Sequence, residues 1–287
     1  MSKRISTELI CIDAEQEMCL NGVLWKPDEC TSKTAIALFP GTGGEFFDSL
    51  FLFLGPRLAD AGYMTLSLNR RDHGSQSGFH SLAASAGDHG LGIDFLVSQG
   101  AEKIILGGHS YGTVTVPFYV AETNDLRVAA MLLYAPLGDL RSGSIKICGG
   151  IEKYQQIVKE AKEKVASGQG SDVFLIPPMV EGGIPLLQTY SIFLDKRGPE
   201  SKAVPIDILK NISHRKILGV RDPADPYPAT LPPSQEKLEA ANSDLVYFLL
   251  NDTRNGNLDA DAHYFKGREE EVLEITLNWI RANKEFS

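Results

Sequence analysis

The residues with the clearest chemical meaning in this sequence surround Ser110. A mostly apolar, strand-like run is followed by Gly-x-Ser-x-Gly at residues 108–112 and then by a predicted helix. This order is typical of a nucleophile elbow, a tight turn that exposes a serine hydroxyl for attack. Glycines suit positions 108 and 112 because side chains there would collide with the neighbouring strand and helix. We expect Ser110 to be a covalent nucleophile; the alternative is that it only caps the helix.

A serine hydroxyl needs a base within hydrogen-bond reach, and the base needs a carboxylate that fixes its tautomer. His263 lies in the loop between a strand predicted at 245–250 and the final helix. Asp222 follows a strand predicted at 216–220, and Asp225 is the alternative acid three residues later. Open α/β sheets bind ligands at the carboxyl ends of their strands, and the chain order serine, aspartate, histidine fits that architecture. We therefore expect His263 to be the base and Asp222 to be its acid.

The tetrahedral intermediate of acyl transfer needs backbone N–H donors that form an oxyanion hole. The residue after the nucleophile, Tyr111, is expected to supply one donor, and the loop after a strand at 34–39 the other. That loop has the sequence Pro-Gly-Thr-Gly-Gly at residues 40–44, and its glycines allow a close approach of backbone to substrate. We expect Thr42 to be the second donor and Gly41 to contact the substrate. The loop lacks the lysine and the glycine spacing of nucleotide-binding loops.

Apolar strand-like runs alternate with predicted helices along most of the chain. The runs predict strands at 34–39, 64–69, 103–109, 128–134, 216–220 and 245–250, and helices at 47–62, 86–99, 111–123, 234–242 and 267–284. Residues 5–13 and 17–26 predict an antiparallel hairpin at the N-terminus. This alternation predicts an α/β fold with a mostly parallel sheet that is flanked by helices on both faces.

The alternation stops after Pro136 and resumes near residue 216. Residues 138–212 combine a charged helical stretch with scattered apolar pieces, which predicts a helical cap inserted into a core of residues 1–137 and 213–287. Two apolar segments of the cap, 174–179 and 186–193, allow two interpretations. They line the substrate pocket as an apolar wall, or they only pack the cap onto the core. The sequence does not identify the individual cap residues that contact substrate.

Composition excludes several classes of partner. The chain has 287 residues and a formal net charge of -9 without a cluster of lysine and arginine, which argues against a nucleic-acid partner. No apolar run reaches membrane-spanning length, and the first residues lack the apolar core of a secretory signal. The four cysteines lack metal-site spacing, so we expect reduced cysteines in a cytoplasmic protein that acts on a small molecule. The oligomeric state is not predicted.

The motifs together resemble those of the α/β-hydrolase superfamily, and the resemblance covers most of the chain. It is carried by the blocks at residues 39–44, 108–112, 219–223 and 262–265, and by residues 69–74, which look like a loop that often contains Asp-x-Arg-Gly-x-Gly. One departure is that many members have His-Gly where this chain has Pro40-Gly41. That histidine usually supports the oxyanion loop.

The resemblance implies a Ser-His-Asp hydrolase without a metal or organic cofactor. Esters are the commonest targets of the superfamily, so we expect a carboxylic ester of a small to medium, hydrophobic substrate. An amidase, a lactonase or a C–C bond hydrolase with the same triad is an alternative. A non-catalytic ligand-binding protein on the same fold is another, because a fold does not fix a function.

Overall fold

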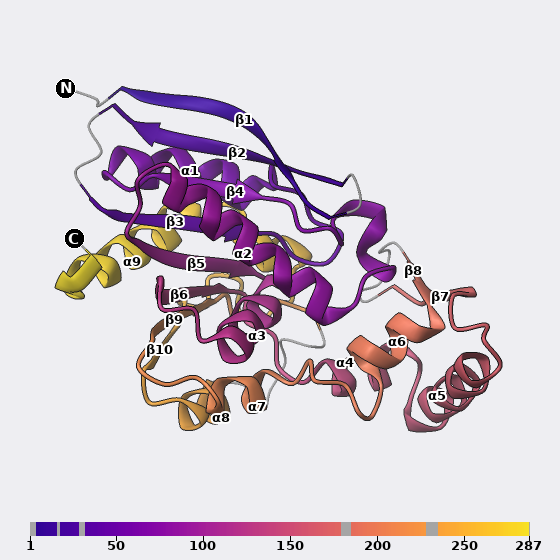
Figure 1. Cartoon of the computed structure of the whole chain (residues 1–287). Helices are drawn as coiled ribbons and strands as arrows, with labels where there is room; N and C mark the ends of the chain where they lie inside the picture. Colours follow the sequence, from indigo (N-terminus) through magenta and orange to yellow (C-terminus); the bar gives the residue numbers. More distant parts are fainter. Residues whose placement is uncertain (1–3, 16–17, 29–31, 179–184, 228–234, 287) are drawn as a thin grey trace.

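An eight-stranded sheet runs through the molecule (Figure 1). The computed structural model describes residues 4–286 apart from 16–17, 29–31, 179–184 and 228–234. The strands lie in the order β1-β2-β4-β3-β5-β6-β9-β10, with β1 and β2 antiparallel, β2 and β4 antiparallel, and every other neighbouring pair parallel. Their bounds are β1 Ile5–Asp13, β2 Cys19–Pro27, β3 Thr34–Phe39, β4 Thr65–Leu68, β5 Lys103–His109, β6 Val128–Tyr134, β9 Lys216–Arg221 and β10 Leu245–Leu249. The predicted fold class is confirmed.

Helices cover both faces of the sheet because the central strands are apolar on both sides. In β3, Ile36 and Leu38 pack with one layer, whereas Ala37 packs with the other. The first layer contains α1 (Ser49–Asp60) and α9 (Glu269–Ala282), and the second contains α2 (Leu82–Ser98), α3 (Gly112–Thr123), α7 (Pro205–Lys210) and α8 (Gln235–Ala241). Burial on both faces is what a continuous apolar strand requires.

Helix α2 begins at Leu82, earlier than the residue 86 expected from the sequence. The Ser81 side chain accepts a hydrogen bond from the Ala84 backbone N–H (3.1 Å), which is a helix N-cap. The 3-10 turn Gly74–Gly78 shortens the loop before it.

The chain between β6 and β9 forms a helical unit with its own apolar core. It contains α4 (Leu140–Ile147), α5 (Ile151–Ala166), the two-stranded sheet of β7 (Val173–Ile176) and β8 (Leu186–Thr189), α6 (Tyr190–Arg197) and α7. Phe174 stacks on Tyr190 with ring centroids 4.5 Å apart, and both pack around Phe193. These apolar residues therefore fill the inside of the unit, and neither interpretation of the two segments, a pocket wall or packing onto the core, describes this internal packing. Residue 179 lies outside the described residues. Helix α7 packs instead on α3 and α8.

The N-terminal hairpin brings two cysteines together. Cys11 and Cys19 lie diagonally across β1 and β2, with 5.7 Å between their Cα atoms, and are joined in a disulfide. Cys148 is buried and outside any disulfide, and Cys30 falls outside the described residues. The expectation of reduced cysteines is therefore wrong for Cys11 and Cys19. The spacing of these cysteines matches no cysteine motif, and only the pairing of the two hairpin strands brings them together. None of the described helices is long and apolar enough to span a lipid bilayer.

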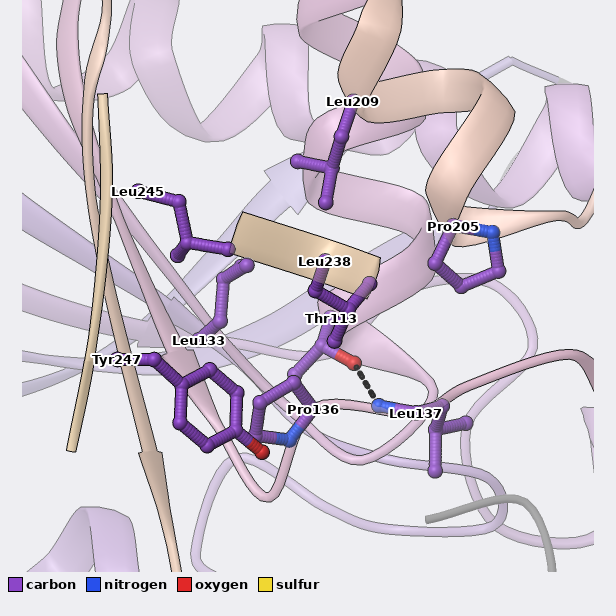
Figure 2. A pocket seen from close by; sticks show the side chains of 9 residues that line it. All are labelled: Thr113, Leu133, Pro136, Leu137, Pro205, Leu209, Leu238, Leu245 and Tyr247. Carbon is purple, nitrogen blue, oxygen red and sulfur yellow. Dashed lines mark hydrogen bonds between the residues drawn. The ribbon is translucent and has the colours of Figure 1, made fainter. Parts of the chain in front are cut away.

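A small apolar cavity lies between α3, α7, α8 and β10 (Figure 2). Its volume of about 10 Å³ leaves room for about one water molecule. On its wall, the Thr113 hydroxyl accepts a hydrogen bond from the Leu137 N–H (3.1 Å). The cavity is too small for a substrate, and we interpret it as imperfect packing beside the elbow.

Candidate active site

Ser110 occupies the sharp turn between β5 and α3. Its φ of 53° lies in the left-handed region, which a residue with a side chain rarely adopts. The turn is held by hydrogen bonds from Ser110 N–H to the Tyr134 carbonyl (3.0 Å) and from Thr113 N–H to the Ser110 carbonyl (2.8 Å). The Thr113 hydroxyl donates a second bond to the same carbonyl (2.6 Å). The surroundings thus fix a backbone conformation that is unfavourable by itself.

Close backbone contacts explain the glycines around the nucleophile. A Cβ on Gly108 would lie 2.3 Å from the Gly112 carbonyl oxygen, and a Cβ on Gly112 would lie 2.6 Å from the Phe39 carbonyl oxygen. A Cβ on Gly41 would lie 2.8 Å from the Ser110 Cβ. Gly41, expected to contact substrate, is therefore packed directly against the serine.

The structure pairs His263 with Asp225. His263 lies in the short 3-10 turn Ala260–Tyr264, and its Nδ1 is 2.8 Å from Asp225 Oδ2. Both side chains are almost fully buried, and the Tyr227 ring lies against His263 with a centroid separation of 4.0 Å. The other Asp225 oxygen accepts from the Tyr227 N–H (3.0 Å). A carboxylate at Nδ1 keeps the hydrogen there, so Nε2 is left as the proton acceptor.

Asp222, the acid preferred from the sequence, is directed elsewhere. Its Oδ1 accepts from the Ala224 N–H (2.9 Å), and its Oδ2 forms an ion pair with Arg268 at the start of α9 (3.3 Å). The carboxylate thus folds back on the turn that follows β9, a local interaction that aspartate favours. The same turn carries Asp225 to His263. This corrects the sequence-based choice between the two acids.

The elbow and His263 are joined through His109. Its Nε2 lies 2.7 Å from the His263 carbonyl oxygen, and the two rings are 4.8 Å apart. Burial lowers the pKa of His109 to about 3, so the ring is neutral near pH 7. A carbonyl only accepts, so Nε2 carries the hydrogen and donates it. In the described residues the Ser110 hydroxyl has no hydrogen bond to His263, and such contacts often tighten only when substrate binds.

The buried His109 is expected to make stability depend on pH. Below its usual pKa of 6.5 the unfolded chain binds a proton that the folded chain refuses until about pH 3. The contribution of neutral His109 to the free energy of unfolding is therefore at its full value above pH 6.5 and declines as the pH falls below it. When the pH is lowered from 7 to 5, the free energy of unfolding measured in urea titrations should fall by about 2 kcal/mol less in His109→Gln than in the wild type. An equal decline in both proteins would contradict this; the exposed His214→Gln is the control.

Arg70 supports the loop after β3, which is expected to form part of the oxyanion hole and has Pro40 in place of the histidine that many members of the superfamily have. It is fully buried and donates through Nη1 to the Pro40 carbonyl and through Nη2 to the Gly41 carbonyl (3.4 Å). Its Nε donates to Asp72 Oδ1 (2.9 Å). A guanidinium provides several donors in one rigid plane, so one side chain reaches both carbonyls and its own counter-ion. In the sequence, Arg70 stands out only as part of the 69–74 loop, because its contacts with the Pro40 and Gly41 carbonyls depend on three-dimensional proximity.

Arg70→Lys should therefore lower kcat about 100-fold with a smaller change in KM. An ammonium keeps the charge beside Asp72 but does not reach both carbonyls, so the oxyanion loop loses its fixed position. Loss of a single oxyanion donor costs about 100- to 1,000-fold in kcat, which sets the scale. Steady-state kinetics beside a circular dichroism spectrum test this. Wild-type kcat in a folded variant would show that the loop does not depend on Arg70.

The two expected oxyanion donors have available N–H groups. Among the described residues, neither Thr42 N–H nor Tyr111 N–H donates to a protein acceptor. The Tyr111 ring contacts two cations, with Arg70 5.7 Å and the Lys196 ammonium 4.9 Å from its centroid. Cation–π contacts of this kind help to hold the residue whose N–H is expected to face the substrate.

Comparisons with known proteins agree with this geometry at the level of the fold. Residues 57–182 match the family described as "Protein of unknown function (DUF1749)", which is placed among the α/β-hydrolases. The siderophore hydrolase EstB from Aspergillus fumigatus is similar in structure, with a TM-score of 0.66 and 14% identity over 96% of this chain and 98% of that one. This chain has the α/β-hydrolase fold.

Two further solved structures with the α/β-hydrolase fold are similar over nearly the whole chain. Est1E from Butyrivibrio proteoclasticus, solved with ferulic acid bound, has a TM-score of 0.62 and 16% identity over 94% of this chain and 98% of that one. A highly thermostable carboxyl esterase from Bacillus coagulans has a TM-score of 0.66 and 11% identity over 96% and 99%. A sequence comparison with curated proteins finds no match.

Proposed function

We propose that this protein is a serine hydrolase that cleaves a carboxylic ester through an acyl-enzyme. The observation that carries the proposal is the buried Asp225–His263 pair, tied through His109 to the elbow at Ser110. Ester cleavage is favoured by the neighbours, since one is described as a carboxyl esterase and another as a siderophore hydrolase. Residues 138–212 are proposed to act as the cap over the site.

The mechanism uses the same groups in both half-reactions, with His263 first accepting and then donating a proton in each. His263 Nε2 takes the proton from the Ser110 hydroxyl as Oγ attacks the ester carbonyl, and Asp225 stabilises the imidazolium. The N–H groups of Thr42 and Tyr111 stabilise the oxyanion. The C–O bond to the alcohol then breaks, and the alcohol leaves with the proton from His263. Water attacks the acyl-enzyme with the same proton transfers, which releases the acid and regenerates the serine.

A panel of p-nitrophenyl esters of increasing acyl length tests the proposal, beside anilides, lactones and a diketone. Stopped-flow mixing with excess ester should give a burst of p-nitrophenolate close to one equivalent per chain, because acylation precedes hydrolysis. Ester turnover with this burst supports the proposal. Faster turnover of the anilides, lactones or diketone would replace the ester assignment, and no turnover of any class would favour a binding protein.

A further inference from the structure

A small, partly open chamber is lined by Thr42 and Tyr111, the two residues of the proposed oxyanion hole. Thr42 and Tyr111 line it from the core, and Gln188 of β8 and Lys196 and Arg197 of α6 line it from the opposite side. An apolar pocket wall was one of the two interpretations of the segment 186–193, which contains Gln188. Leu140 and Leu186 line the chamber as well, but the cap also contributes the Gln188 amide and the two cations to it, and Asp72 lines it from the core.

Several polar groups of the chamber are buried without a partner among the described residues. The Gln188 side chain is 1% exposed, and neither its Nε2 nor its Oε1 has a hydrogen bond. The Tyr111 hydroxyl and the Arg197 Nε are also buried without a hydrogen-bond partner among the described residues. Buried polar atoms are nearly always paired in folded proteins, because leaving one unpaired costs free energy. Three such groups at one chamber indicate that a ligand pairs with them.

The charges around the chamber favour an anion. Asp72 is shared by two cations, with Arg70 Nε at 2.9 Å and the Lys196 ammonium at 3.0 Å. Among the described residues the Arg197 guanidinium donates only to the Ser144 hydroxyl (3.1 Å) and forms no ion pair with a carboxylate. Arg197 is 7% exposed, and a buried cation is expensive without a counter-ion.

We propose that the chamber binds a carboxylate of the substrate, close to the scissile carbonyl. The donors are the Arg197 guanidinium, Gln188 Nε2 and the Tyr111 hydroxyl. The inference rests on the proposed hydrolase function, since it names the substrate class of the same site. At about 10 Å³ the chamber is as small as the cavity of Figure 2, so a carboxylate fits only if a side chain moves aside. Gln188 is the side chain we expect to move, because no hydrogen bond among the described residues holds its amide in place.

Three esters of similar size test the proposal: monomethyl glutarate with the charge on the acyl side, carboxymethyl butyrate with the charge on the alcohol side, and neutral ethyl butyrate. For the wild type, kcat/KM of one charged ester should exceed that of the neutral ester at least tenfold. The favoured ester shows on which side of the scissile bond the carboxylate lies. If neither charged ester is favoured, the proposal is overturned. Failure to hydrolyse any of the three would instead contradict the proposed function.

Substitutions identify the residues responsible for the preference. Arg197→Met should lower the ratio of charged to neutral kcat/KM about 10- to 100-fold, since a hydrogen bond to a charged group is lost. Gln188→Leu should lower the ratio about tenfold and keeps the test available if Arg197→Met does not fold. Lys162→Met, an exposed cation on α5, should leave the ratio unchanged. A ratio that stays at the wild-type value in both chamber variants would overturn the assignment.

Discussion

Ser110→Ala is expected to lower kcat for esters about 10⁶-fold while the protein stays folded. Removing the nucleophile of a Ser-His-Asp triad costs about as much as removing the whole triad, because its members act as a unit. The fold should tolerate the change, since Ser110 takes part in hydrogen bonds of the described residues only through its backbone, and alanine keeps the Cβ that packs on Gly41.

Steady-state rates and thermal melting measure this expectation together. Ser98→Ala is a matched control at the exposed end of α2, and it should keep wild-type kcat. Activity of folded Ser110→Ala within tenfold of the wild type would mean that another group attacks the substrate.

Asp225→Asn is expected to lower kcat about 10⁴-fold, far more than Asp222→Asn. An amide at position 225 no longer favours the hydrogen on Nδ1 of His263, and it does not stabilise the imidazolium. Asp222→Asn should reduce kcat by less than about tenfold and instead lower the melting temperature, since the buried ion pair with Arg268 is lost.

Kinetics and melting curves of both variants separate the two carboxylates. The variants are matched controls for each other, because both replace a buried aspartate of the same turn. If Asp222→Asn shows the larger loss of kcat, then the pairing of His263 with Asp225 is not the catalytic one.

The strands that carry the site were predictable, because each is an apolar run whose ends are marked by turn residues. The bounds of β5 and β6 agree with the expected residues 103–109 and 128–134, since each is an apolar run that ends at a turn. The elbow was predictable for a related reason, because steric crowding leaves only glycine at positions 108 and 112.

The side chains that pair with His263 and with the loop after β3 were less predictable. Asp222 and Asp225 both follow β9, and the choice depends on whether a carboxylate folds back on its own turn or extends to His263. Spacing does not encode that difference. Arg70, Gln188 and Arg197 were not identified as site residues, because they reach the site from the loop after β4 and from the segment before β9, far from the elbow in sequence.

Labelling with a fluorophosphonate probe tests the central claim most directly, namely that Ser110 is an activated nucleophile. Intact-mass analysis of the wild type should show one phosphonyl adduct per chain, and peptide mapping should place it on Ser110. Ser110→Ala should stay unlabelled, and Asp225→Asn should label much more slowly than Asp222→Asn. A folded wild type without an adduct, or an adduct that persists in Ser110→Ala, would contradict the account.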